Sequence, residues 1–173
     1  IAHQYITCKG EQEWEALGWM NGYEITFTIP SSVQVLELGF RKSGYNATAT
    51  GMVTTDNQVL NQLYQEAYDT LYVCMRDSYM DCPDRERTQW WGDAVINMQQ
   101  AAYALDEQGA LLYKKTLTQA VGFMLPNGAI PSMVALGNDN LELPMQTLAG
   151  VHSFWQYYMY YGDKELVVDA YPT

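Results

Sequence analysis

The hydrophobic pattern of this chain changes its period near residue 54, and this change divides the sequence into two parts. Before it, residues 24–30 and 33–40 alternate polar and apolar side chains, and a pair of serines separates the two runs. Alternation of this kind predicts two β-strands joined by a turn, and residues 45–53 are a candidate third strand. We therefore expect residues 1–53 to be the end of an antiparallel β-sandwich domain.

After the change, the pattern predicts a helical domain over residues 54–173. Apolar residues such as Val59, Leu63 and Leu71 recur at spacings of three, four and seven, which is typical of helices. Helices of about four turns joined alternately by short breaks and long loops favour a helical-hairpin toroid over a plain bundle. The expected helices cover 54–78 with a cap at Thr55 or Asp56, 90–105, 111–125, 145–161 and a stretch from 164 onward, with a long loop over 126–144.

Composition excludes several classes of function. The 173 residues carry a formal net charge of −11, so binding to nucleic acid or to an anionic membrane is not expected, because both need clustered lysine and arginine. No apolar run is long enough to span a membrane, and no signal peptide is visible. Three cysteines without metal-like spacing, the lack of a phosphate-binding glycine loop and the lack of a histidine cluster predict no metal and no cofactor. A neutral partner such as a glycan is compatible with this composition.

Residues 79–93 gather charges and large aromatic side chains more densely than any other stretch. Pro83 breaks a helix entering this stretch, so its acids lie on a bend and at the start of the next helix. A bend that holds carboxyl groups against aromatic surface suits sugar hydrolysis, which needs a proton donor and a flat apolar surface. The alternative is a charged loop that only caps the next helix. The residues concerned are Asp81, Asp84, Arg85, Glu86, Arg87, Trp90, Trp91 and Asp93.

The run from Asp81 through Cys82, Pro83 and Arg85 to Glu86, followed by a Trp-Trp-Gly-Asp segment, resembles the signature of the bacterial alpha-L-rhamnosidases, glycoside hydrolase family seventy-eight. Residues 127–131 are similar to a proline-flanked loop of that family, and residues 157–163 to its aromatic helix end. The resemblance implies a mainly α fold, part of an (α/α)6 barrel preceded by strands of a β-sandwich. It also implies inverting hydrolysis of terminal alpha-L-rhamnosides, with a rhamnose-containing glycan or glycoside as the partner. The resemblance favours a location in the periplasm or outside the cell over the cytoplasm.

Carried over by position, the resemblance implies that Glu86 is the general acid. It also implies that Asp81, Arg85 and Asp93 bind the sugar. A shift of register would exchange the roles of Asp84 and Glu86. The candidates for sugar contact among the aromatic residues are Trp90, Trp91 and Trp155, and at least one of Trp90 and Trp91 is expected to be only a core residue.

The resemblance also places the general base beyond Thr173. The remainder of a parent chain is therefore an expected partner of these residues, and the isolated chain is expected to be inactive. Other functions remain open, namely another (α/α)6 glycosidase or a non-catalytic carbohydrate-binding domain. The pKa of Glu86 is open as well: burial and nearby carboxylates would raise it, and the neighbouring arginines would lower it.

Overall fold

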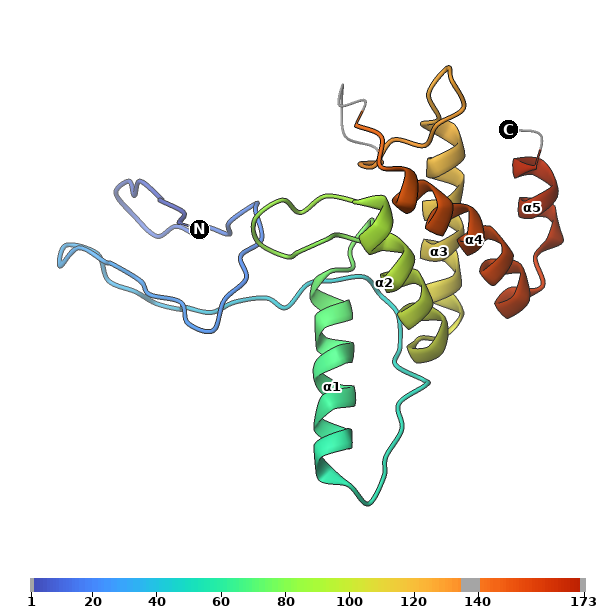
Figure 1. Ribbon diagram of the computed structural model, residues 1–173. Helices are drawn as coiled ribbons and strands as arrows, with labels where there is room; N and C mark the ends of the chain where they lie inside the picture. The colour runs from blue at the N-terminus through green and yellow to red at the C-terminus, as the bar shows by residue number, and fades with distance from the viewer. Residues whose placement is uncertain (1, 135–140, 172–173) are drawn as a thin grey trace. The chain divides into compact units, whose positions relative to one another are not determined.

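The structure is a computed structural model that describes residues 2–134 and 141–171, so Gly137, Asn138, Asp139 and Asn140 of the long loop lie outside it. The chain forms two compact units, Ile1–Arg41 and Lys42–Thr173, and all helices belong to the second (Figure 1). No helix of the described residues is both long and apolar enough to cross a bilayer. The helices are α1 Gln58–Val73, α2 Trp91–Ala104, α3 Glu107–Gly122, α4 Pro144–Tyr161 and α5 Lys164–Ala170.

The described residues of the first unit form turns, bends and irregular backbone, without a ladder of paired strands. The turn expected between residues 30 and 33 is present, with the Val33 amide donating to the Pro30 carbonyl at 3.0 Å. The strands expected over 24–30 and 33–40 do not form, and the described residues contain isolated bridges only. A hairpin becomes stable when further strands or a packed face support it, and here apolar side chains such as Phe27 and Phe40 stay exposed. The β-sandwich of residues 1–53 remains a prediction.

The segment expected as a third strand is instead tied to the helices. Thr48 and Asp106 bond reciprocally: the Thr48 amide donates to Asp106 Oδ2 at 3.1 Å, and the Asp106 amide to the Thr48 carbonyl at 2.9 Å. The Gly51 amide donates to the Ala104 carbonyl at 3.0 Å. A Cβ atom on Gly51 would lie 1.8 Å from the Tyr103 carbonyl oxygen, so glycine permits this close approach. Residues 45–51 therefore cross the junction between α2 and α3.

Helix ends follow the capping side chains. Asn57, rather than Thr55 or Asp56, caps α1, and its Oδ1 accepts from the amides of Val59 and Leu60. The helix ends at Val73, five residues before the expected end. Helix α3 starts four residues earlier than expected, because Asp106 in the predicted break accepts from the Gln108 amide at 3.1 Å and caps the helix.

The core lies where α2, α3 and α4 pack together, while α5 packs on α3 and α4. Among the described helices, α1 contacts α2 alone. Trp91 is fully buried, and α4 approaches it at Gly150, where a Cβ atom would lie 1.6 Å from the indole nitrogen. The start of α2 is therefore fixed by a glycine that lies 59 positions further along the chain.

Candidate active site

The acidic stretch folds as a loop whose two ends are joined by backbone contacts. The Asp81 amide donates to the Thr88 carbonyl at 2.9 Å, and the Thr88 amide donates to Asp81 Oδ1 at 2.9 Å. Asn97 of α2 donates its side-chain amide to the Met80 carbonyl at 3.1 Å. The loop is thus closed on itself and attached to the helix that follows it.

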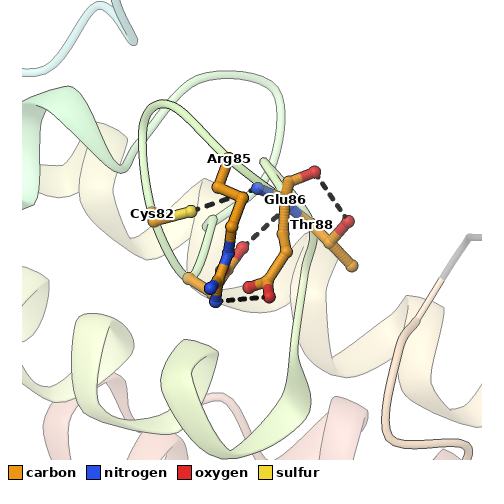
Figure 2. Close-up of polar contacts among 5 residues, drawn as sticks. Cys82, Arg85, Glu86 and Thr88 are labelled. Atoms are coloured by element: carbon orange, nitrogen blue, oxygen red, sulfur yellow. Dashed lines mark hydrogen bonds and ion pairs between the residues drawn. The ribbon is translucent and has the colours of Figure 1, made fainter.

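Contacts within the loop orient Glu86. Its amide donates to Cys82 Sγ at 3.3 Å, and its carbonyl accepts from Thr88 Oγ1 at 3.1 Å (Figure 2). Arg87 has a left-handed backbone with φ 54°, a conformation that is uncommon for residues other than glycine and asparagine. Arg85 and Glu86 directly precede this turn, and their side chains run alongside each other (Figure 2).

Asp81 and Glu86 form a hydrogen-bonded pair of carboxyl groups. The hydrogen bond with Asp81 raises the pKa of Glu86, partial desolvation adds to the rise, and the charge of Arg85 opposes it. Burial would raise the pKa of Asp81, but hydrogen bonds from Glu86, the Thr88 amide and Cys82 outweigh burial and lower it. The two pKa values are therefore shifted in opposite directions, so Glu86 is the group of the pair that is protonated more readily.

Asp93 is the third residue of α2 and lies in the first turn of the helix that follows the loop. Partial desolvation raises its pKa, and the charge of Asp81 raises it further. The buried thiol of Cys74 has a raised pKa because of its burial and the nearby charges of Cys82, Asp81 and Asp93. Asp81 therefore interacts electrostatically with both Glu86 and Asp93.

The two arginines pair with different acids. Arg85 contacts Glu86 Oε1 at 2.6 Å, with 83% of the arginine side chain and 36% of the glutamate side chain exposed. Arg87 lies 3.7 Å from Asp84 and donates its Nε to the Asp84 carbonyl at 3.0 Å. Asp84 is thus engaged with Arg87, whereas Glu86 lies beside Asp81.

The three tryptophans expected to contact sugar have different environments. Trp90 is half-buried and is the N-cap residue of α2. Trp91 is fully buried in the core, so its ring has no face open to a ligand and its role is packing against α4. Trp155 lies on α4 with 55% of its surface exposed, and its ring contacts Tyr158 on the same helix.

A second segment, residues 132–134, pairs with the end of the acidic loop and was not expected from the sequence. The Trp91 amide donates to the Ser132 carbonyl at 2.7 Å, and the Val134 amide donates to the Gln89 carbonyl at 3.0 Å. Trp90 and Met133 face each other in the resulting antiparallel bridge. The sequence carries only a weak signal for it, because three residues after a proline are too few to establish an alternating pattern.

One group among the described residues has donor atoms close enough to hold a metal ion. Asp81, Cys82 and Glu86 place one donor atom each within 4.8 Å of one another. The guanidinium group of Arg85 already contacts Glu86, and its positive charge disfavours a second cation at this position. The chemistry that fits the group best is proton transfer.

Comparison with known proteins gives the family. Residues 48–173, more than half of the chain, match the bacterial alpha-L-rhamnosidase 6 hairpin glycosidase domain. The chain belongs to this family. The bacterial alpha-L-rhamnosidase domain was expected from the acidic stretch, and that prediction is confirmed.

An alpha-L-rhamnosidase from Formosa agariphila is 26% identical to the chain over 186 residues, which cover 98% of this chain and 19% of that relative. The chain thus spans about a fifth of the length of the curated relative that it matches. No solved structure matches it. The five helices are consistent with part of the (α/α)6 barrel of the alpha-L-rhamnosidase six-hairpin domain, so the expected fold class is confirmed.

Proposed function

We propose that the protein containing this chain is a glycoside hydrolase that cleaves terminal alpha-L-rhamnosides with inversion, and that Glu86 is its general acid. The observation that carries this proposal is the carboxyl pair: donor atoms of Glu86 and Asp81 lie within 4.8 Å of each other, and the pKa of Glu86 is raised while that of Asp81 is lowered. A general acid must be protonated near the working pH, and enzymes achieve this by raising its pKa. Asp84, the alternative acid, pairs with Arg87 instead.

In the proposed reaction, Glu86 donates its proton to the oxygen that links rhamnose to the next group, so that the leaving group departs as a neutral alcohol. Asp81 and Asp93 accept hydrogen bonds from sugar hydroxyls, and Arg85 donates hydrogen bonds to the sugar from the rim of the loop. The half-buried ring of Trp90 supplies apolar surface at the start of α2. Trp155 stays a weaker candidate for sugar contact because its ring lies on α4 beside Tyr158.

Inversion also needs a second carboxylate that activates water at roughly 6.5–9.5 Å from the acid. Asp81 is hydrogen-bonded to Glu86 and is therefore too close to serve as this base. We assign the base to a part of the six-hairpin domain that these 173 residues do not include. The assignment agrees with the 19% of the Formosa agariphila relative that the chain covers.

The test is Glu86→Gln in the full-length enzyme, with Asp84→Asn as the matched control. Loss of a general acid costs about 10²–10⁴-fold in turnover, and the loss is greatest for a rhamnoside with an alkyl leaving group. A nitrophenyl rhamnoside needs little proton donation and should lose less. The control should retain turnover on both substrates, because Asp84 is exposed and engages Arg87.

Near-normal turnover of the alkyl rhamnoside by the Glu86→Gln enzyme would exclude Glu86 as the acid. If the unsubstituted enzyme releases a different sugar from a panel of glycosides, the rhamnoside assignment fails and another (α/α)6 glycosidase is the better description. Binding of glycans without any hydrolysis would instead point to a non-catalytic carbohydrate-binding domain.

A further inference from the structure

The antiparallel pairing of residues 89–91 with residues 132–134 sorts their side chains onto two faces. Trp90 and Met133 form the directly opposed pair, flanked by the two backbone hydrogen bonds. A pair in this position has no hydrogen bond of its own, and its side chains are closer together than those of a hydrogen-bonded pair. Gln89, Trp91, Ser132 and Val134 all lie on the other face, and all four are buried.

The face with Trp90 and Met133 stays half-exposed, and it adjoins the carboxyl groups. The Trp90 amide donates to the Thr88 carbonyl at 2.9 Å, and the same carbonyl accepts from the Asp81 amide at 2.9 Å. Three residues after Trp90, Asp93 has a pKa that is raised in part by the charge of Asp81, the partner of Glu86. An indole and a thioether therefore form an apolar wall at the edge of the acidic group.

On the basis of the proposed function, we infer that Met133, together with Trp90, is a specificity-determining residue that contacts the methyl group of the 6-deoxy sugar. Rhamnose carries a methyl group where the corresponding hexose carries a hydroxymethyl group. An indole face and a flexible, polarisable methionine side chain suit a methyl group. The same wall leaves the extra hydroxyl of the hexose without a hydrogen-bond partner, which is unfavourable.

The experiment compares two aryl glycosides that differ only at carbon six, the alpha-L-rhamnoside and the alpha-L-mannoside. The full-length enzyme is assayed unsubstituted and as Met133→Gln, Met133→Leu and Met159→Gln, and the quantity is the ratio of the two kcat/KM values. Because both substrates are measured on the same preparation, the ratio does not depend on how much of a variant is folded.

Met133→Gln should reduce the preference for rhamnoside about tenfold, since its amide can bond the extra hydroxyl. Met133→Leu should keep the preference because it preserves an apolar wall. Met159→Gln makes the same chemical change at an exposed methionine of α4 and should also keep it.

A rhamnoside preference that is unchanged in an active Met133→Gln enzyme would overturn this inference and leave the proposed function standing. Equal loss of preference in Met133→Leu would also overturn it, because apolar contact would then not be the cause. Failure of the unsubstituted enzyme to cleave the rhamnoside would overturn the proposed function, and this inference with it.

Discussion

At the scale of single residues, the acidic loop shifts the pKa values of two neighbouring carboxyl groups, Asp81 and Glu86, in opposite directions. Asp81 accepts hydrogen bonds from the Thr88 amide, the Cys82 thiol and Glu86, and these stabilise its ionised form. Glu86 has one cation beside it, Arg85, and the hydrogen bond with Asp81 has the larger effect on its pKa. The loop thus favours protonation of Glu86 relative to Asp81, although the two acids are only five positions apart in sequence.

Replacing Asp81 by Asn should lower the pKa of Glu86. The hydrogen bond with Asp81 is the main cause of the raised pKa, and an asparagine amide that donates to Glu86 would favour its ionised form instead. A general acid is active while protonated, so activity is lost as pH rises through its pKa. The alkaline limb of the pH profile of kcat/KM should therefore move to lower pH in Asp81→Asn. A limb that stays in place would contradict the carboxyl pair as the source of the shift.

Replacing Arg85 by Gln should act in the opposite direction. The Arg85 charge, 2.6 Å from Glu86, lowers the glutamate pKa, so its removal should raise the pKa and extend activity to higher pH. Carbon-13 labelling of the glutamate side chains would show the titration of Glu86 directly. A lower pKa for Glu86 in Arg85→Gln would be inconsistent with the observed contact. Because Arg85 is largely exposed, the effect should shrink at high salt.

At the scale of helices, the start of α2 depends on a close approach by α4. Trp91 is fully buried at the first position of α2, and Gly150 of α4 leaves room for its indole. The same short stretch of α2 carries Asp93, while Trp90 immediately precedes it. Packing in the core and the placement of the candidate site are therefore coupled through one tryptophan.

Gly150→Ala should lower the free energy of unfolding by about 1–3 kcal/mol, because an added methyl group overpacks this contact. Urea unfolding followed by tryptophan fluorescence would measure the change. Gly122→Ala is the matched control, since a Cβ atom there meets nothing within 4 Å. Equal stability of the Gly150→Ala protein and the unsubstituted protein would show that α4 can move away from Trp91 at little cost.

Asp106→Ala should also destabilise the helical unit. Asp106 caps α3 and accepts from the Thr48 amide of the segment that crosses it, and loss of a cap costs about 1 kcal/mol. Asp106→Asn retains an acceptor for the cap and should recover most of the loss in urea unfolding. An Asn variant as unstable as the Ala variant would mean that the charge, rather than the hydrogen bonds, matters here.

At the scale of the whole molecule, the outer face of α1 lacks a neighbour among the described residues. The apolar stripe that predicted this helix includes Val59 and Leu63, which are 74% and 63% exposed, and Leu71, which is buried. In contrast, α2, α3 and α4 bury their apolar residues against one another. A six-hairpin domain has more helices than the five described here, and we propose that helices in the remainder of the domain cover this face of α1.

The polypeptide of residues 1–173 alone should release no rhamnose from a nitrophenyl rhamnoside. It contains the proposed acid, but Asp81 is too close to Glu86 to act as the base of an inverting reaction. Circular dichroism should be recorded on the same sample to show that the helices are present. Rhamnose release at a rate comparable with that of the full-length enzyme would disprove the assignment of the base to another part of the domain.

Several features could be predicted from the sequence because they depend on neighbours along the chain. Helix α5 begins at Lys164 and α4 ends at Tyr161 as expected, since Asp163 and Gly162 provide local capping. The acidic stretch and its place before α2 were also predicted, because Pro83 and the adjacent charges act locally. The missed cap at Asp106 has a local signal too, an aspartate before a helical run, which we had interpreted as a break.

The sequence by itself determined the helical segments and the family, and it predicted which residues are candidates for the chemistry. Only the tertiary structure decided that Trp91 is buried, that Trp90 faces Met133 and that the pKa of Glu86 is raised next to Asp81. The physical reason is that helical periodicity and capping depend on residues a few positions apart. Burial, strand pairing and pKa depend instead on groups that folding brings together. Residues 24–40 have no partner strands here, and they form no sheet.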